Sequence, residues 1–157
     1  MFCWHKEDLD LYSINYLHFG KPKIWYCIPE QDSEKFERYC QFQFNSQYEQ
    51  CHEFLRHKSI QISPTILKSA GIKFDTAVHN PGEFIIIFSG CYHMGFNSGF
   101  NCAEAVNFAL EKWVDIGIKA KRCKCDGDTV QIDMDAFRSN LEERREKNKP
   151  CKKRKIE

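Results

Sequence analysis

The sequence has no apolar run of about 18 residues, the length that a membrane-spanning helix requires. Its start does not combine basic residues with an apolar stretch, so it does not indicate a secretory signal peptide. The formal net charge is only +1, which gives the chain as a whole no electrostatic attraction to nucleic acid. No internal repeat is visible. These absences favour a soluble intracellular protein that makes no membrane contact.

The sequence does contain enough apolar material for one core, and many cysteines. With 157 residues, 42% of them hydrophobic and 14% aromatic, the chain can bury a sizeable interior. Nine cysteines would suggest disulfides in a secreted domain. In an intracellular chain they favour a metal site together with buried thiols.

Strand patterns flank a central helical region. Runs rich in apolar and aromatic residues predict strands over 11–19, 23–28, 74–80, 83–88 and 101–108. The first two are separated by Gly20-Lys21-Pro22, and we expect them to be neighbours in one antiparallel sheet. The run over 83–88 is the most hydrophobic and predicts a strand buried on both faces. The run over 101–108 fits strand or helix by periodicity, and we favour strand.

Helix signals occupy the middle and the C-terminal part of the chain. They predict helices over about 32–44, 51–57, 63–71 and 133–146. Asp32 or Ser33 can cap the first of these, and Pro64 fits the first turn of the third. Many strands with few helices predict a mainly β fold with flanking helices (α+β), of the double-sheet jelly-roll or cupin-like type.

The first seven residues carry two side chains that can hold a metal. His5 and Glu7 are two residues apart, so they project from the same face of an extended segment. A third candidate, His93, lies in the glycine-rich stretch 90–99. Two histidines and a carboxylate form the facial triad that binds non-heme Fe(II) and leaves positions open. A His-x-Glu pair also arises by chance in a chain of this composition, so His93 is the residue that favours iron.

A second set of ligands is separated widely along the chain. Cys123 and Cys125 form a close thiolate pair, and Cys51 and His57 add a thiolate and an imidazole. Together they could form a tetrahedral structural zinc site. Buried thiols and a surface histidine are the alternative, because the Cys-x-Cys gap is shorter than usual and the two halves lie far apart. Spacing alone leaves both possibilities open.

The stretches 4–20, 54–58 and 92–104, together with the Cys123-x-Cys125 pair, resemble one family over about residues 1–140. This is the JmjC (Jumonji) family of histone lysine demethylases, and in particular its zinc-containing lysine demethylase 4 subfamily. The resemblance implies Fe(II), with 2-oxoglutarate and dioxygen as co-substrates. It places the iron ligands at His5, Glu7 and His93. It places the subfamily's zinc ligands at Cys51, His57, Cys123 and Cys125.

The resemblance also assigns residues to the co-substrate. Lys23 matches the lysine that pairs with the distal carboxylate of 2-oxoglutarate, for which a point cation is suited. Asn15 matches a position that hydrogen-bonds the co-substrate, and Phe2 and Trp25 match aromatic walls around it. Without the resemblance, these residues would equally suit a turn lysine, an edge asparagine and ordinary aromatic core.

The implied reaction decarboxylates 2-oxoglutarate to succinate and hydroxylates an N-methyl group, which leaves as formaldehyde. The implied substrate is a methylated lysine of the histone H3 tail, so chromatin is the expected partner and the nucleus the expected location. Glu7, Ala105 and Asn107 match parts of the methylammonium pocket. Ala105-Val106 resembles the apolar version of a pair that accompanies a preference for lysine 9 over lysine 36.

The resemblance also has gaps. In the family, about half of the jelly roll precedes the first iron ligand, whereas four residues precede His5 here. A co-substrate tyrosine and the tyrosine and glycine positions of the methylammonium pocket are missing with it. We therefore expect either a fragment of a longer enzyme or a truncated, non-catalytic, zinc-stabilised chromatin interaction module. Retention of the iron ligands together with Lys23 and Asn15 favours the enzyme.

We expect three regions along the chain. Residues 1–110 would form a partial double-stranded β-helix with inserted helices. Residues 111–146 would form a C-terminal extension held by a zinc ion that it shares with 51–57. Residues 147–157 would be a basic disordered tail, which could be a nuclear import signal, contact DNA directly, or be a solvated terminus.

Overall fold

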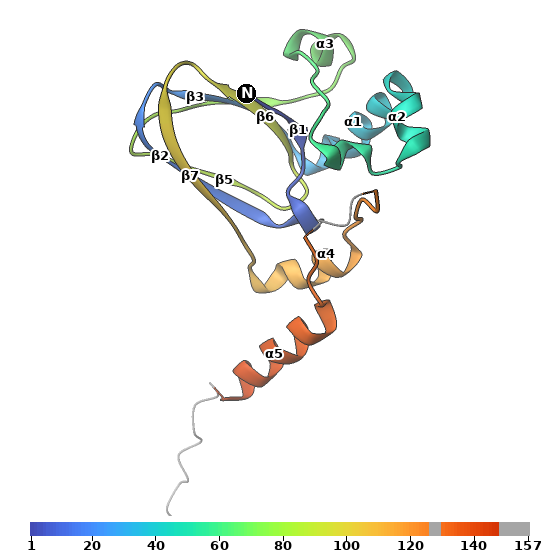
Figure 1. The fold of residues 1–157 in the computed structure, drawn as a ribbon, viewed down its shortest axis with the longest axis vertical. Coiled ribbons are helices and arrows are strands. Elements are labelled where there is room, and N and C mark those ends of the chain that lie inside the picture. The colour runs from blue at the N-terminus through green and yellow to red at the C-terminus, as the bar shows by residue number, and fades with distance from the viewer. Residues whose placement is uncertain (126–129, 148–157) are drawn as a thin grey trace, which may run out of the picture.

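The chain folds into two antiparallel sheets that face each other, with helices gathered beside them (Figure 1). The structure is a computed structural model that describes residues 1–125 and 130–147. The first sheet has the order β1-β6-β3-β4 and consists of β1 (Phe2–His5), β6 (Tyr92–Asn97), β3 (Lys23–Ile28) and β4 (Asp75–His79). The second has the order β5-β2-β7 and consists of β5 (Phe84–Ile87), β2 (Tyr12–Gly20) and β7 (Asn101–Phe108). This mainly β architecture agrees with the predicted class.

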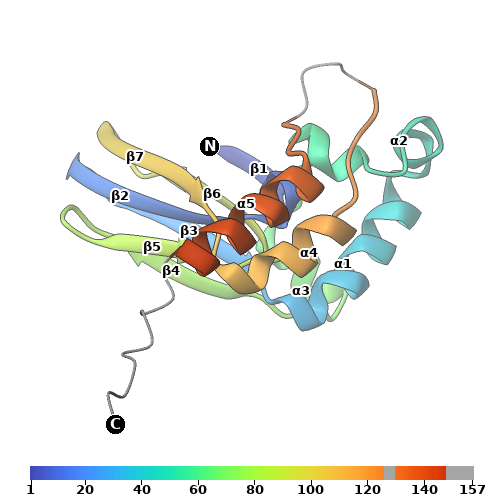
Figure 2. The ribbon, with the colours of Figure 1, turned by 90° about the horizontal axis from the view of Figure 1, so that it is seen from below.

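The helices lie towards one end of the sheets, as Figure 2 shows from below. They are α1 (Glu30–Gln43), α2 (Asn45–Gln50), α3 (Pro64–Ser69), α4 (Val114–Lys119) and α5 (Met134–Lys147). Short 3-10 turns cover Asp8–Asp10, Phe54–His57 and Glu111–Trp113. In the part of the chain that the structure describes, no helix is both long and apolar enough to cross a membrane.

The main core lies between the four-stranded sheet and the inserted helices. Trp4 of β1 is fully buried there, and its indole N–H donates to the carbonyl of Ile62 at 2.9 Å. Phe36 and Cys40 of α1, one helical turn apart, are also fully buried against this sheet. A smaller cluster around Trp113 joins the C-terminal helices to the Asp8–Asp10 turn. Packing of Trp4 against the inserted helices therefore holds β1 in place on the side of the sheet that faces those helices.

Two strand predictions are wrong. Residues 11–19 and 23–28 are strands, but β2 and β3 belong to different sheets, because the Gly20-Lys21-Pro22 turn carries the chain from one to the other. The 83–88 run is not buried on both faces: Phe84 and Phe88 are each 60% exposed, and Ile87 is buried. Within the described part of the chain, β5 is one edge of its sheet and pairs with β2 alone. Burial alternates along the strand, since Ile86 is also exposed, so only one face of β5 reaches the interior.

The helix predictions hold in part. α1 begins earlier than predicted, at Glu30, and Ser33 does not cap it, because its hydroxyl donates to the carbonyls of Pro29 and Gly90. Of the predicted 51–57 helix only the Phe54–His57 turn is present, while α2 occupies the segment just before it. The predicted third and last helices are present as α3 and α5. Lys147 ends α5, and the rest of the predicted tail lies outside the described residues.

We predict that Gly95→Ala destabilises the four-stranded sheet. A Cβ at this position would meet the carbonyl oxygen of Ile24 and lie 2.7 Å from Phe2 Cζ. Overpacking of this kind typically costs about 1–3 kcal/mol. Urea unfolding of both proteins measures the change. Gly99→Ala is the comparison, and we expect it to cost less. Its Cβ would lie 2.7 Å from Lys21 Cγ, which a change of rotamer moves, whereas the carbonyl oxygen of Ile24 moves only with its strand. Equal stability of the two variants would contradict the prediction.

Candidate metal centres

The predicted iron ligands lie together between the two sheets. β1 pairs antiparallel with β6, and His5 lies directly opposite His93, so that their ring centroids are 4.2 Å apart. Glu7 Oε1 lies 3.4 Å from His93 Nε2. One ligand atom from each of the three side chains lies within 4.8 Å of the other two. Two imidazoles and one carboxylate thus point at a single position.

Backbone carbonyls orient both histidines. His5 Nδ1 lies 2.7 Å from the carbonyl of Cys3, and His93 Nδ1 lies 3.3 Å from that of Cys91. A carbonyl only accepts hydrogen bonds, so Nδ1 of His5 carries the proton and its Nε2 keeps its lone pair. This tautomer is the one that metal-binding histidines adopt, because their second nitrogen donates to a fixed acceptor.

The charge states also suit a metal ligand set. Burial and the neighbouring His93 lower the pKa of His5 to about 4. Burial raises the pKa of Glu7, but hydrogen bonds from His93 and Asn107 outweigh this effect and bring the pKa down to about 2. At neutral pH, His5 is therefore uncharged and Glu7 ionised, which are the forms in which imidazole and carboxylate bind metal ions.

The predicted co-substrate residues lie beside this cluster. Lys23 is buried, donates to Asn97 Oδ1 at 2.6 Å, and has its pKa lowered by burial. Asn15 Oδ1 is buried and has no hydrogen-bond partner among the described residues. Buried polar atoms are normally paired. Exchanging the oxygen and nitrogen of the Asn15 amide would put its NH2, a donor, at the unpaired position, where it can serve a ligand rich in acceptor oxygens. The donor sets present here therefore fit both Fe(II) and 2-oxoglutarate.

Aromatic rings close one side of the cluster. The ring of Phe2 lies 5.0 Å from that of Trp25 and 6.2 Å from that of His93, measured between centroids. Lys23 Nζ lies 5.8 Å from the centre of the Phe2 ring. The indole N–H of Trp25 donates to Nδ1 of the fully buried His79 at 3.3 Å. These rings form an apolar wall between the buried lysine and the two histidines.

The predicted substrate residues divide between the two faces of β7. Ala105 and Asn107 pair with Asn15 and Ser13 of β2, so they share the inner face with the cluster. Val106 pairs with Ile14 and is exposed on the outer face. Within the predicted Ala105-Val106 pair, Ala105 therefore lies on the face that carries the cluster, where it remains exposed, and Val106 lies on the opposite face.

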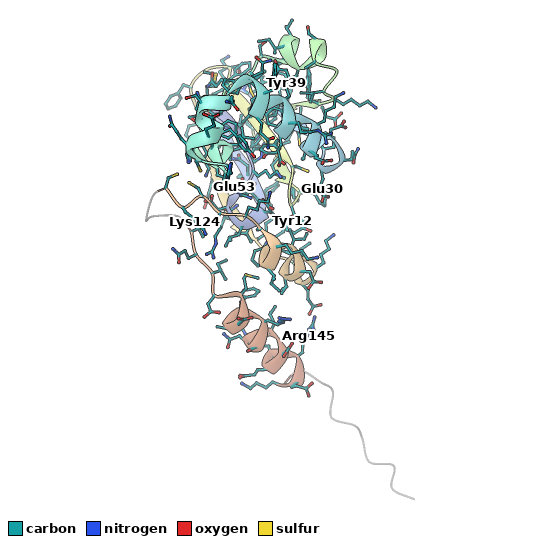
Figure 3. All side chains as sticks on the ribbon, turned by 90° about the vertical axis from the view of Figure 1, so that its right-hand side faces the viewer. Tyr12, Glu30, Tyr39, Glu53, Lys124 and Arg145 are labelled. Carbon is teal, nitrogen blue, oxygen red and sulfur yellow. The ribbon has the colours of Figure 1, made fainter. Side chains whose placement is uncertain are left out.

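The four predicted zinc ligands lie together at the junction of the inserted helices and the C-terminal segment. Cys123 Sγ lies 3.6 Å from Cys51 Sγ and 3.0 Å from His57 Nε2. All four ligand atoms, including Cys125 Sγ, lie within 4.8 Å of one another. Figure 3 shows the segment of Lys124, between Cys123 and Cys125, passing close to Glu53 in the turn before His57. Three thiols and one imidazole fit a closed tetrahedral zinc site.

The sequence did not indicate which residues hydrogen-bond to the segments that carry the candidate iron ligands. Arg56 Nη1 donates to the main-chain carbonyl of Glu7 at 3.1 Å, and its Nη2 donates to Asp10 Oδ1 at 2.8 Å. Glu37 of α1 accepts hydrogen bonds from Lys6 and Tyr92, each of which is next to an iron-ligand candidate. The alternation of inward and outward side chains around His5 and His93 is the only signal in the sequence that points to these neighbours.

Comparison with known proteins gives a consistent assignment. The family model described as "JmjC domain, hydroxylase" matches residues 1–108. Over 136 residues, the chain is 50% identical to lysine-specific demethylase 4D of Rattus norvegicus and to probable lysine-specific demethylase 4F of Homo sapiens. Over the same number of residues it is 52% identical to lysine-specific demethylase 4B of Mus musculus.

These alignments cover 87% of this chain but only part of each relative. The aligned part makes up 27% of the rat protein, 21% of the human one and 12% of the mouse one. The chain therefore spans about a quarter or less of the length of these relatives. The family model matches well over half of the chain, including His5, Glu7 and His93. The chain belongs to the JmjC domain family of hydroxylases.

Proposed function

We propose that the chain supplies the metal-binding half of the active site of an Fe(II)- and 2-oxoglutarate-dependent histone lysine demethylase. The observation that carries this proposal is the convergence of His5, Glu7 and His93 on one position in a member of a hydroxylase family. A cluster with two imidazoles and one carboxylate occupies one face of an iron ion and leaves the opposite face open. A metal that serves only structure would have all its positions filled.

The residues around the cluster have distinct tasks in this proposal. His5, Glu7 and His93 hold the iron, which supplies the oxidising chemistry when 2-oxoglutarate and dioxygen are bound. The Lys23 ammonium binds the distal carboxylate of 2-oxoglutarate, and its burial among rings strengthens that attraction. The Asn15 amide supplies a second polar contact. The Phe2 and Trp25 rings exclude water from this side.

The substrate in this proposal is a methylated lysine of the histone H3 tail, and lysine 9 is favoured. The relatives are lysine-specific demethylases by name, which supports a methyl-lysine substrate. Asn107 hydrogen-bonds Glu7, and Ala105 lies on the same face of β7, which supports a role for all three in binding the methylammonium group. The small apolar Ala105 on the inner face supports the lysine 9 preference. Such a substrate places the protein on chromatin in the nucleus.

Formaldehyde release from a histone H3 peptide trimethylated at lysine 9 tests this function. The proteins are the 157-residue chain and a chimera in which it replaces the matching segment of rat lysine-specific demethylase 4D. We expect slow release by the chain alone, because it lacks walls of the methylammonium pocket, and faster release by the chimera. Mass spectrometry of the peptide confirms the loss of the methyl group.

His93→Ala is the control in both proteins, because it removes one iron ligand from an otherwise intact sheet. We expect release to fall to background in this variant. Activity that survives His93→Ala would exclude the iron mechanism. A silent chimera would favour the non-catalytic interaction module instead. Equal rates on lysine 9 and lysine 36 peptides would contradict the proposed preference.

We further propose that one zinc ion joins two regions of the chain. Cys51 and His57 come from the region of the inserted helices, within 1–110, and Cys123 and Cys125 from the C-terminal extension, 111–146. Beside this site, Lys121 Nζ lies 4.0 Å from Glu53 Oε1, which adds a weaker ion pair between the same regions. The basic stretch after Lys147 remains a candidate for nuclear import or for contact with DNA.

A further inference from the structure

Each candidate iron ligand has a neighbour in the sequence that points away from the metal position. Lys6 lies between His5 and Glu7, and Tyr92 precedes His93. Along extended backbone, successive side chains point to opposite faces. Lys6 and Tyr92 therefore emerge on the outer side of the four-stranded sheet, where α1 covers it.

A single carboxylate holds both of these outer side chains. Glu37 Oε1 accepts a hydrogen bond from Lys6 Nζ at 2.8 Å and another from Tyr92 Oη at 2.9 Å. Lys6 Nζ also lies 4.7 Å from the centre of the Tyr92 ring. β1 and β6 are paired strands, so this one oxygen atom joins the two ligand-bearing segments from behind.

The carboxylate itself has a fixed position. Phe36, its neighbour on α1, is fully buried and packs against Tyr92 with ring centroids 4.8 Å apart. Burial raises the pKa of Glu37, but the Lys6 ammonium and the Tyr92 hydroxyl outweigh this effect and lower it. Glu37 is therefore ionised, and hydrogen bonds to an ionised acceptor are the stronger kind.

We propose that Glu37 is a positioning residue for the iron site, which fixes the spacing between the His5–Glu7 segment and His93 by holding Lys6 and Tyr92. This inference rests on the proposed iron site. Metal affinity depends on ligands held in place before the metal arrives, and loss of an orienting group typically lowers affinity about 10- to 100-fold. Glu37 acts through two intervening residues, so the lower end of this range applies.

Mn(II) binding to the full chain tests the proposal, with the free ion followed by electron paramagnetic resonance. The protein is first given one equivalent of zinc, which the thiolate cluster takes in preference to imidazole and carboxylate ligands, so that this cluster does not compete for the added Mn(II). We expect Glu37→Gln to weaken Mn(II) binding about 10-fold. Tyr92→Phe removes only one of the two hydrogen bonds, and we expect a smaller loss of a few fold. Titrations run well below the thermal midpoint, where a loss of stability alone leaves the dissociation constant unchanged.

Glu34→Gln is the matched control, because Glu34 is an exposed carboxylate on the same helix, and its ion-pair partner among the described residues is the exposed Arg38, at 3.1 Å. We expect its Mn(II) affinity to match the wild type. Equal affinities for wild type and Glu37→Gln, or equal losses in Glu37→Gln and Glu34→Gln, would overturn the positioning role. If Glu37→Gln fails to fold, an unchanged affinity in Tyr92→Phe would overturn it as well. Two results would contradict the iron site itself. One is a wild-type chain that binds no Mn(II), and the other is a His93→Ala variant that binds Mn(II) as tightly as the wild type.

Discussion

Replacing Cys123 by serine is expected to remove bound zinc and to release the segment that follows α4. Cys123 is the central member of its cluster: its sulfur lies close to both Cys51 and His57, and it accepts the backbone N–H of Cys125 at 3.3 Å. Burial raises the pKa of this thiol, but the hydrogen bonds from Cys125 and His57 outweigh it and bring the pKa to about 7. Cys123 is thus prepared to bind as a thiolate.

The expected effect is large because structural zinc contributes to folding directly, with apparent binding energies of about 10–16 kcal/mol in small domains. Elemental analysis should find one zinc per wild-type chain and almost none in Cys123→Ser. Hydrogen exchange should increase around residues 51–57 and 119–125. Cys102→Ser is the control, since Cys102 is exposed on β7 away from the cluster. A wild-type chain without zinc, or full zinc content in Cys123→Ser, would contradict the proposed site.

Replacing Arg56 by methionine is expected to lower the free energy of unfolding by about 3–5 kcal/mol. The side chains of Arg56 and its partner Asp10 are only 12% and 16% exposed. Methionine would leave the Asp10 carboxylate in this setting without a cation. It would also remove one of the two donors to the carbonyl of Glu7, which keeps the backbone N–H of Asp10 at 3.0 Å. Breaking one side of a buried ion pair is far more costly than replacing both sides, because the remaining charge stays desolvated.

Chemical denaturation of wild type and variant measures this change. Adding Asp10→Asn to Arg56→Met should restore part of the loss, because it removes the unpaired charge. Arg38→Met is the control, since Arg38 forms an exposed pair with Glu34, and such pairs are worth less than about 1 kcal/mol. If the Arg56→Met and Arg38→Met proteins were equally stable, the buried pair would contribute no more to the free energy of unfolding than the exposed pair does.

The sequence predicted local structure more accurately than it predicted which strands pair. Runs of apolar and aromatic residues located β2, β3, β4 and β5. They only favoured a strand for β7, whose pattern fitted a helix as well. The apolar pattern could not show that the turn at Gly20 leads into the opposite sheet, since periodicity carries no information about partners. It also misjudged Phe84 and Phe88, because hydrophobic side chains on an edge strand resemble those of a buried one in sequence.

The candidate site, too, could be predicted from the sequence only in part. Residue types and spacing proposed His5, Glu7 and His93 as one triad and left the four-residue zinc set open, and the family resemblance assigned both sets. The structure brings the members of each set together. The roles of Arg56 and Glu37 could not be predicted, because each depends on a contact between segments more than 30 residues apart. No spacing rule describes such contacts. They arise only when α1 and the Phe54–His57 turn pack behind the ligand-bearing strands.

The position of β7 at the end of its sheet affects how the protein can be handled in the laboratory. Among the described residues no strand covers its outer side, so it presents a row of free backbone N–H and C=O groups next to the exposed Val106. Such edges act as templates for strands of other molecules, and the tendency grows with protein concentration. Aggregation in concentrated preparations would reduce the apparent metal content and activity without any change at either metal cluster. Dilute samples, checked by light scattering before each titration, avoid that error.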